Sequence, residues 1–511
     1  MESSHTSLGY FPQMPVCNKH LSTELNSDFT LPDYQSEIKR LLCTKAFLSC
    51  PNEYIGNSSA ELEGTVSYRI IYLGADGKLY CATLEDRFSF SVPLEFTSAH
   101  VNTDDVTLVP YCAVEHASTK VLGPRKLNVR ARLTCKALGL SPALHSTSIT
   151  GAPATVSIEK MTSSVPCAII KRAKSEPLPL SDFIPLDPQI DNVRIIDAHC
   201  NVQFSESVHS ADALETHGEV LLKILYCNDA QSDLPVSTVR KLPFSVNIPT
   251  DGFNSASDCT LNGYVEDLHL DVADNGISIE MLLIVCAELQ GFEDITYAVD
   301  AYSTEYDCEG KSENICILEP LACKNASLTQ NEAFKLEEIR LSKDAKIVDV
   351  FAKVTLNERT VENGRIFLSG KTDYQLIYHL DGEYSAISLS APLRYALKID
   401  ENTLDDDIIN WYVNADTVSL RTRCDSEKLY IDSELKFNYI LQREKTVELL
   451  SELKLFEMAK PVDGDIVLCY PQNNTPIWEV AKKYKKRVSD LRSTNSLSET
   501  DTHVKNKFLV I

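Results

Sequence analysis

The chain has 511 residues, of which 43% are hydrophobic, and a formal net charge of -24 at pH 7. This length exceeds what one ordinary core organises, so several domains are expected. Phosphate backbones and anionic lipid surfaces would repel so acidic a body, which argues against nucleic acid and membrane surfaces as its partners.

The N-terminal residues contain no basic segment followed by an apolar one, so we expect no secretory signal. There is also no run of about 18 apolar residues, the length that a membrane-spanning helix needs. These features predict a cytoplasmic protein without a transmembrane segment. The sixteen cysteines are spread singly, and we expect them to be small buried hydrophobes and not metal ligands.

The clearest internal signal is a glycine followed eight residues later by a tyrosine, at the end of a run rich in strand-forming residues. It occurs three times, in the pairs Gly64 and Tyr72, Gly218 and Tyr226, and Gly370 and Tyr378. Successive glycines lie 154 and 152 residues apart. Self-similarity at a nearly constant period predicts three modules.

Turn residues and later apolar runs indicate the structure of each module. Residues suited to tight hairpins occur at 74–77, 274–276 and 381–382, and a further apolar segment follows in each copy, at 127–134, 277–285 and 429–437. We therefore expect a mainly β fold with three antiparallel β-sandwich or barrel-like modules. Their expected bounds are 25–150, 176–308 and 332–457, with linkers at 162–185 and 309–331.

The repeated glycines and tyrosines are interpreted as structural residues. Glycine inside a strand typically marks a bend or bulge, so Gly64, Gly218 and Gly370 are expected to shape the sheet and not to touch a ligand. The three tyrosines are expected to pack at strand ends with their hydroxyls toward solvent.

The sequence offers little support for catalysis. It contains no phosphate-binding loop of the Walker type, no helical zinc-protease pair and no nucleophile elbow. Asp197 and His199 would share one face of a strand, with Cys200 on the other, but we expect ordinary sheet residues there. The acidic run at 405–407 is expected to be a solvated loop. We predict no enzyme activity, no catalytic residue, no metal site and no cofactor.

The last residues of the chain change their periodicity. A strand is expected at 465–470, then a helix capped by Thr475 with Pro476 as its first residue, a second helix at 488–492 closed by Asn495, and a final strand at 508–511. From residue 465 onward there are eight basic and five acidic residues, on an otherwise acidic chain. The segment 463–511 is therefore expected to be a small α+β domain of βααβ order.

This C-terminal segment resembles the LysM module, through the tryptophan-x-x-alanine pattern of 478–481 and the asparagine and leucine after the second helix. The resemblance implies a core of Trp478, Ala481, Tyr484 and Leu491. It also implies that N-acetylglucosamine-containing glycans or a protein partner bind the two loops formed by Asn473, Asn474, Thr475, Asn495, Ser496, Leu497 and Ser498. The chain departs from the family at 473–474 and 505–507, and these departures count against glycan binding.

The repeats resemble a second family. The segment 31–42, before the first glycine, and the segment 300–306, which closes the second copy, are similar to parts of the SPOCS domain (DUF3794) of spore-forming Firmicutes. SPOCS repeats followed by a LysM module are the layout of spore-coat assembly factors of the SipL type. This resemblance implies a mother-cell protein at the forespore surface that helps a coat morphogenetic ATPase, with LysM as a protein-docking module.

Two functions of different class therefore stand. The first is a non-enzymatic scaffold of spore-coat or envelope assembly, which docks protein partners through its LysM module and β repeats. The alternative is a cell-wall protein that binds peptidoglycan or another N-acetylglucosamine-containing glycan through LysM.

Overall fold

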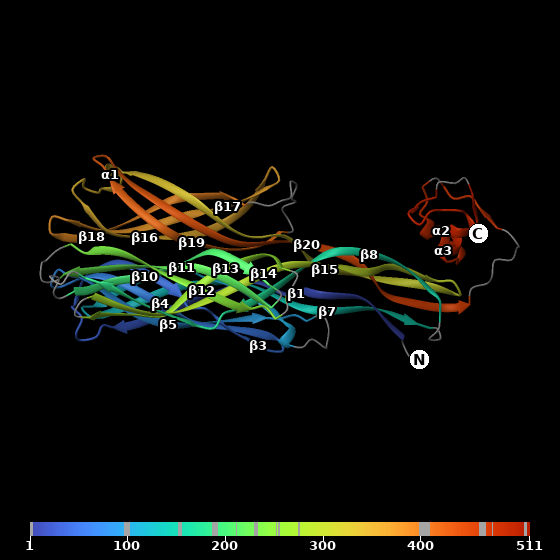
Figure 1. Cartoon of the computed structure of the whole chain (residues 1–511), viewed down its shortest axis with the longest axis horizontal. Coiled ribbons are helices and arrows are strands. Elements are labelled where there is room, and N and C mark those ends of the chain that lie inside the picture. The colour runs from blue at the N-terminus through green and yellow to red at the C-terminus, as the bar shows by residue number, and fades with distance from the viewer. Residues whose placement is uncertain are drawn as a thin grey trace.

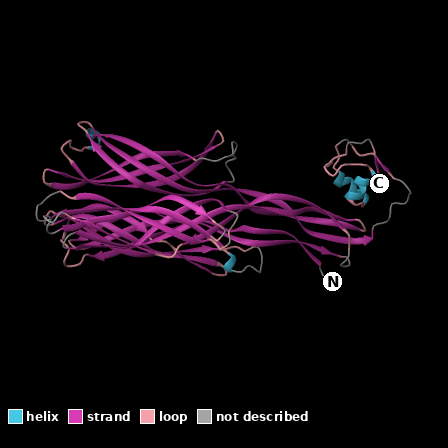
Figure 2. Cartoon of the chain, viewed as in Figure 1, coloured by secondary structure: helices cyan, strands magenta, loops and turns pink. Residues whose placement is uncertain are grey.

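The computed structural model is almost entirely β-structure, arranged as a rod with three modules at one end and a small helical domain at the other (Figures 1 and 2). It describes residues 4–96, 103–151, 156–186, 193–210, 212–228, 234–251, 253, 256–273, 276–397, 409–458, 467–472, 474–504 and 508–511. The expected fold class is confirmed, with several open antiparallel sheets and a small C-terminal helical region.

Each module is a sandwich of two sheets. The first module contains β1 (Ser4–Thr30), β2 (Ile38–Leu48), β3 (Asn52–Ile55), β4 (Ser59–Gly74), β5 (Leu79–Pro93), the 3-10 helix η1 (Thr103–Asp105), β6 (Thr107–Gly123) and β7 (Lys126–Thr150). One sheet has the order β2-β4-β5, with β3 extending β2 along the edge of β4, and the other has β1-β7-β6. Buried residues of both sheets form one core between them.

The second and third modules repeat this plan. The second contains β8 (Ile158–Lys174), β9 (Leu178–Pro185), β10 (Val193–His209), β11 (Ala213–Asn228), β12 (Val236–Pro249), β13 (Ala256–Ala273) and β14 (Gly276–Ser303). The third contains β15 (Tyr306–Lys335), the helical turn α1 (Leu336–Ile339), β16 (Lys346–Glu362), β17 (Arg365–Leu380), β18 (Glu383–Ala396), β19 (Ile409–Cys424) and β20 (Lys428–Met458). In the second module β8 and β9 together pair with β14 as β1 pairs with β7.

The expected linkers are wrong, because both are strands. Residues 162–185 form most of β8 and β9, and 309–331 lie within β15. The second and third modules therefore begin before the expected 176 and 332. The apolar residues of these strands pack partly in the stalk core and partly in the sandwich cores of their modules. The proline, serine and charged residues between them resembled the composition of a linker.

The ends of six long strands form a stalk beyond the sandwiches (Figure 1). β1 with β7, β8 with β14, and β15 with β20 contribute one antiparallel pair each. Their shared core includes Phe11, Cys167, Tyr297, Ile317 and Leu449. A short parallel contact between β20 and β7, centred on Leu453 and Ile149, joins the first and third pairs near the tip.

Tight turns join successive strands at the places where the sequence predicts hairpins. β4 turns into β5 through Gly77 at φ 80°, and β17 turns into β18 through Asp381 and Gly382 at φ 50° and 82°. In the second module Ala273 pairs with Gly276, and residues 274 and 275 of the expected turn lie outside the described residues. The turns of the first and third modules confirm the hairpins expected there.

Each repeated glycine faces an irregularity in the neighbouring strand. Gly218 lies opposite Phe204 at a register shift of β10, Gly370 lies opposite Leu356 at one of β16, and Gly64 lies where pairing passes from β2 to β3. A Cβ at Gly218 or Gly370 would collide with the backbone of the facing strand. The structural interpretation of the glycines is thus confirmed.

The expectation for the tyrosines holds only in part. Tyr226 and Tyr378 are half-buried, whereas Tyr72 is fully buried and its hydroxyl donates to the backbone oxygen of Ser36 at 3.1 Å. All sixteen cysteines are free and buried or half-buried, as expected.

The C-terminal domain, called the tail module below, contains β21 (Leu468–Cys469), α2 (Ile477–Tyr484), α3 (Val488–Thr494) and β22 (Leu509–Val510). This is the expected βααβ order, with shorter strands. The helix cap differs from the prediction by one residue. Pro476 is the N-cap of α2 and has no side-chain cap, while the Thr475 hydroxyl donates to the Gln472 backbone oxygen at 2.8 Å.

Candidate functional site

The tail module has a small core that holds its two helices against its two-stranded sheet. Ala481 and Leu491 are buried in this core, and Trp478 and Tyr484 pack against it while partly exposed. The four residues expected in the core therefore contribute to it. The part of Trp478 that this core does not cover makes a contact outside the module.

The first expected binding loop precedes α2. Asn473 lies outside the described residues, and Asn474 is exposed with a left-handed backbone at φ 69°. Thr475 is half-buried, and its hydroxyl is used within the loop. Asn474 therefore provides the side chain that this loop offers to a ligand among its described residues.

The second expected loop is held by its own asparagine. The Asn495 side-chain amide donates to the backbone oxygens of Leu491 at 2.9 Å and Val510 at 2.7 Å, and its side-chain oxygen accepts from the Val510 N–H at 2.7 Å. Leu497 packs against the core, while Ser496 and Ser498 are exposed. Asn495 thus fastens β22 to α3, and the two serines are what the loop presents to solvent.

The outer face of the tail sheet is apolar. Leu468 and Tyr470 flank the buried Cys469, and Phe508 precedes the buried Leu509, so alternation directs all three outward. Tyr470 is 71% exposed, and its ring lies 6.2 Å from that of Phe508. An exposed cluster of large apolar side chains typically marks an interaction surface. We call Leu468, Tyr470 and Phe508 the apolar face.

A different side of the tail module is docked on the stalk. The Trp478 ring meets Tyr302 of β14 edge-on at a centroid distance of 4.9 Å, and its indole N–H donates to Asp300 Oδ2 at 2.8 Å. The Tyr302 hydroxyl donates to the Lys486 backbone oxygen at 2.6 Å. Aromatic packing and paired hydrogen bonds together fix the orientation of α2 against the stalk.

The same contact engages basic side chains at the end of α2 and in the segment that joins it to α3. Lys482 Nζ of α2 lies 2.6 and 2.7 Å from the two carboxylate oxygens of Asp300, and Lys485, after the helix, pairs with Asp307. Arg487 donates to the Ser157 hydroxyl at 3.2 Å. These three positive charges, a natural surface for an acidic partner, are therefore directed in this structure toward the protein's own stalk.

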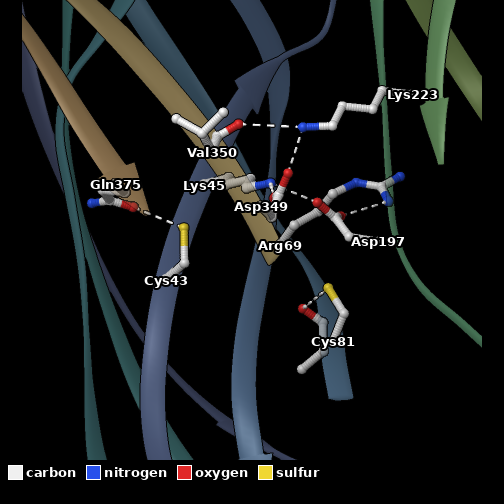
Figure 3. A network of polar contacts seen from close by, with 10 residues as sticks. Cys43, Lys45, Arg69, Cys81, Asp197, Lys223, Asp349, Val350 and Gln375 are labelled. Atoms are coloured by element: carbon white, nitrogen blue, oxygen red, sulfur yellow. Dashed lines mark hydrogen bonds and ion pairs between the residues drawn. The ribbon is translucent and has the colours of Figure 1, made fainter. Parts of the chain in front are cut away.

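A second polar cluster lies between the modules (Figure 3). Lys45 of β2 is completely buried, and its Nζ lies 2.7 Å from Asp197 Oδ2 of β10 and 2.9 Å from Asp349 Oδ2 of β16. Burial alone would lower the pKa of Lys45, but the two carboxylates raise it. Burial would raise the pKa of both aspartates, yet Lys45 and their other cations hold it below the usual value.

This cluster follows the internal repeat. Cys43, Asp197 and Asp349 each follow a register shift and pair with the residue seven positions after the module's glycine. Each is contacted by the residue five positions after the glycine of a neighbouring module. Arg69 reaches Asp197 at 3.5 Å, Lys223 reaches Asp349 at 2.5 Å, and Cys43 Sγ donates to Gln375 Oε1 at 2.8 Å. The contacts run from module one to two, two to three, and three to one. The modules are thus arranged as a pseudo-trimer.

These contacts account for the Asp197 and His199 pair considered as a catalytic candidate. Asp197 is occupied by Lys45 and Arg69, and burial lowers the pKa of His199 to about 4, with the Lys45 charge acting in the same direction. His199 is therefore neutral at pH 7. Both residues belong to a structural interface.

A cavity of about 1410 Å³ also lies between the modules and is lined by residues of all three. Its wall combines aromatic rings such as Phe47 and Phe204 with charges of both signs, including Asp416 and Lys436. Burial raises the pKa of Asp416 despite the nearby lysine. The mixed lining does not select one class of ligand.

The sequence could not identify the stalk contact or the inter-module cluster as sites. Their residues come from strands far apart in the chain and carry no local motif. Within the described residues, no group of three or more His, Cys, Asp or Glu side chains is placed to hold a metal ion, and no helix has the length and apolar character needed to cross a bilayer. No protein-family model, curated protein or solved structure matches this chain.

Proposed function

We propose that this protein is a non-enzymatic scaffold of spore-coat or envelope assembly, which docks a protein partner through its tail module. The observation that carries the proposal is the apolar face. Leu468, Tyr470 and Phe508 are 48%, 71% and 48% exposed on a module whose opposite helix is already anchored. Exposed aromatic and aliphatic side chains grouped in this way are typical of a surface that binds another protein.

The architecture supports a role as an adaptor. The three-module body and the tail module lie at opposite ends of the rod, so each end is free to meet a different partner (Figure 1). Docking of α2 on the stalk sets the direction in which the apolar face points. The resemblance of the repeats and tail to SPOCS and LysM domains supplies the coat-assembly setting, including a coat morphogenetic ATPase as the partner.

The loops support the alternative, a glycan-binding protein, less well. The Asn495 side-chain amide makes its hydrogen bonds to backbone groups inside the module, and the Thr475 hydroxyl donates to a backbone oxygen of its own loop. The Ser498 hydroxyl likewise accepts from the Thr500 N–H at 3.0 Å within its loop, so exposed Asn474 and Ser496 remain as polar groups for a sugar. A glycan-binding function would therefore depend mainly on these two residues.

One experiment separates the two functions. Tagged full-length protein and a Tyr470→Ala/Phe508→Ala variant are recovered from sporulating cells, and each is also sedimented with purified peptidoglycan. The scaffold proposal expects bound coat proteins with the wild type, their loss with the variant, and no sedimentation with the wall.

A matched control is Phe292→Ala, which removes a 54% exposed aromatic ring from β14 and should leave partner capture unchanged. Sedimentation with peptidoglycan that is lost on Asn474→Ala would instead establish the glycan function. Equal partner capture by wild type and the double variant would refute docking through the apolar face.

A further inference from the structure

Two cysteines from different modules meet inside the protein. Cys50 follows the end of β2 in the first module, and Cys286 lies on β14 in the second. Their Sγ atoms are 3.4 Å apart, although 236 positions separate them in the sequence. Both are almost fully buried, at 3% and 2% exposure. Other described cysteines are also buried, but this pair places two thiols in direct contact across a module boundary.

The surrounding structure holds both thiols in place. The Cys50 N–H donates to Glu266 Oε1 of β13 at 3.2 Å, which ties the first module's chain to the second. Ile284 and Tyr264 pack around the two sulfurs. An ion pair between Arg172 and Glu53 bridges the same two modules. Formation of a disulfide, with an S–S bond of about 2.05 Å, therefore requires the two sulfurs to approach by roughly 1.4 Å from their 3.4 Å separation.

The two thiols differ in acidity in a way that suits stepwise oxidation. The hydrogen bond with Cys286 lowers the pKa of Cys50 to about 7, against burial and with help from Lys174 and Arg172. The same contact and burial raise the pKa of Cys286, which keeps its proton. A thiolate is the form that attacks an oxidant, and the lower pKa favours this form in Cys50.

We propose that Cys50 and Cys286 form an oxidation site that takes hydrogen peroxide and joins the first two modules by a disulfide. The Cys50 thiolate attacks one peroxide oxygen, forming an S–O bond and breaking the O–O bond, which leaves a sulfenic acid and, after protonation, one water. Cys286 sulfur then attacks the Cys50 sulfur, forming the S–S bond and expelling hydroxide, which takes the Cys286 proton and leaves as water. Two thiols are oxidised and one peroxide is reduced to two waters.

The inter-module cavity comes within one residue of this site. Ser49, next to Cys50, and Tyr264, which packs on the pair, both line the cavity. Peroxide is close to water in size, whereas a bulky thiol reagent would be excluded. The pair should therefore react with peroxide while it resists large alkylating agents.

Peroxide treatment of the folded full-length protein tests the site. After removal of peroxide and blocking of free thiols in denaturant, peptide mass spectrometry should find the Cys50–Cys286 cross-link. Non-reducing electrophoresis should show a faster band, because the bond closes a loop of 236 positions. Cys286→Ser should abolish both signals and leave Cys50 as a sulfenic acid that dimedone labels.

Cys112 and Cys135 provide the matched control, because they are direct register partners on β6 and β7 within one module. Cys112→Ser/Cys135→Ser should leave the Cys50–Cys286 cross-link unchanged. Circular dichroism of each reduced variant checks that it folds as the wild type does. A folded wild type with no Cys50–Cys286 cross-link, or with Cys50 joined to Cys112 instead, would overturn the proposal.

Discussion

Replacement of Asp349 by asparagine tests how the pseudo-trimer is held together. The Asp349 carboxylate is 3% exposed and faces both Lys45 and Lys223. An asparagine side chain in its place would keep the shape but remove the carboxylate that pairs with Lys223 and leave Lys45 with one carboxylate, Asp197. Removing one partner of a buried ion pair costs about 3–5 kcal/mol. We expect a loss of stability in this range.

The size of the decrease in Tm also shows how many residues unfold together. With an unfolding entropy of about 2.1 cal/mol/K per residue, a loss of about 4 kcal/mol lowers Tm by roughly 4 °C if about 450 residues unfold together. The same loss lowers Tm by roughly 15 °C if one module of about 130 residues unfolds alone. Differential scanning calorimetry distinguishes these outcomes. Because Lys45 joins all three modules, we expect the smaller shift and a single transition.

A second substitution tests the electrostatic reasoning itself. Lys45→Met in the Asp349→Asn background removes the excess positive charge, and should recover roughly 2 kcal/mol, within the coupling of about 0.5–3 kcal/mol found for contacting residues. The exposed pair of Glu383 with Lys39 gives the control, since Glu383→Gln should cost less than about 1 kcal/mol. Additive effects of the two substitutions, or an Asp349→Asn cost as small as that of Glu383→Gln, would refute the reasoning.

The pH dependence follows from the same contacts. Asp197 and Asp349 have folded-state pKa values below that of an ordinary aspartate, about 3.9. Their contribution is therefore present above about pH 4 and is lost as the pH falls through the folded-state values. The stability difference between wild type and Asp349→Asn should shrink on acidification. A difference that stays constant from pH 7 to pH 2 would contradict this assignment.

Three further predictions concern the glycines and the tail module. Gly218→Ala should cost about 1–3 kcal/mol, because its Cβ meets the backbone of the facing strand, whereas Gly123→Ala, whose Cβ would make an ordinary contact with Lys126 Cβ at 4.0 Å, should be nearly neutral in thermal unfolding. Asn495→Ala should destabilise the tail module by about 1–3 kcal/mol through unpaired backbone groups, measured as earlier melting of the tail tryptophan fluorescence. In a Trp411→Phe background, Asp300→Ala should expose the tail tryptophan to acrylamide quenching, and salt should act in the same direction by screening the Lys482 pair. Unchanged quenching would show that aromatic packing alone holds the tail.

Local chemistry made much of the fold predictable. The glycine and aspartate turns at 74–77 and 381–382 have the backbone angles that such residues favour, and the helical spacing of Ile477, Val480 and Ala481 produced α2, which begins one residue after its expected start. These predictions held because the determining residues are neighbours in sequence.

Contacts between residues far apart in the sequence determine the features that the sequence did not predict. The strands within 162–185 and 309–331 were mistaken for linkers because proline, serine and charged residues interrupt their apolar ones, and strands far away in the sequence complete the cores that these apolar residues join. Asn495 had the residue type of a ligand contact, but the arrival of β22 turned it into a structural clamp. The partners of Lys45 come from modules 152 and 304 positions away, beyond the reach of any local pattern.

Lys45, His199 and Phe351 pair with the residues five positions after their glycines, and so occupy one position in three copies. In a homotrimer every residue near the axis occurs three times, and three lysines at this position would repel one another. Because the three copies lie on one chain, their residues at this position can differ. The Lys45 ammonium pairs with the carboxylates of Asp197 and Asp349, while the neutral His199 and Phe351 occupy the equivalent positions of the other two modules. A single module excised from this protein should therefore fail to rebuild the assembly from identical copies.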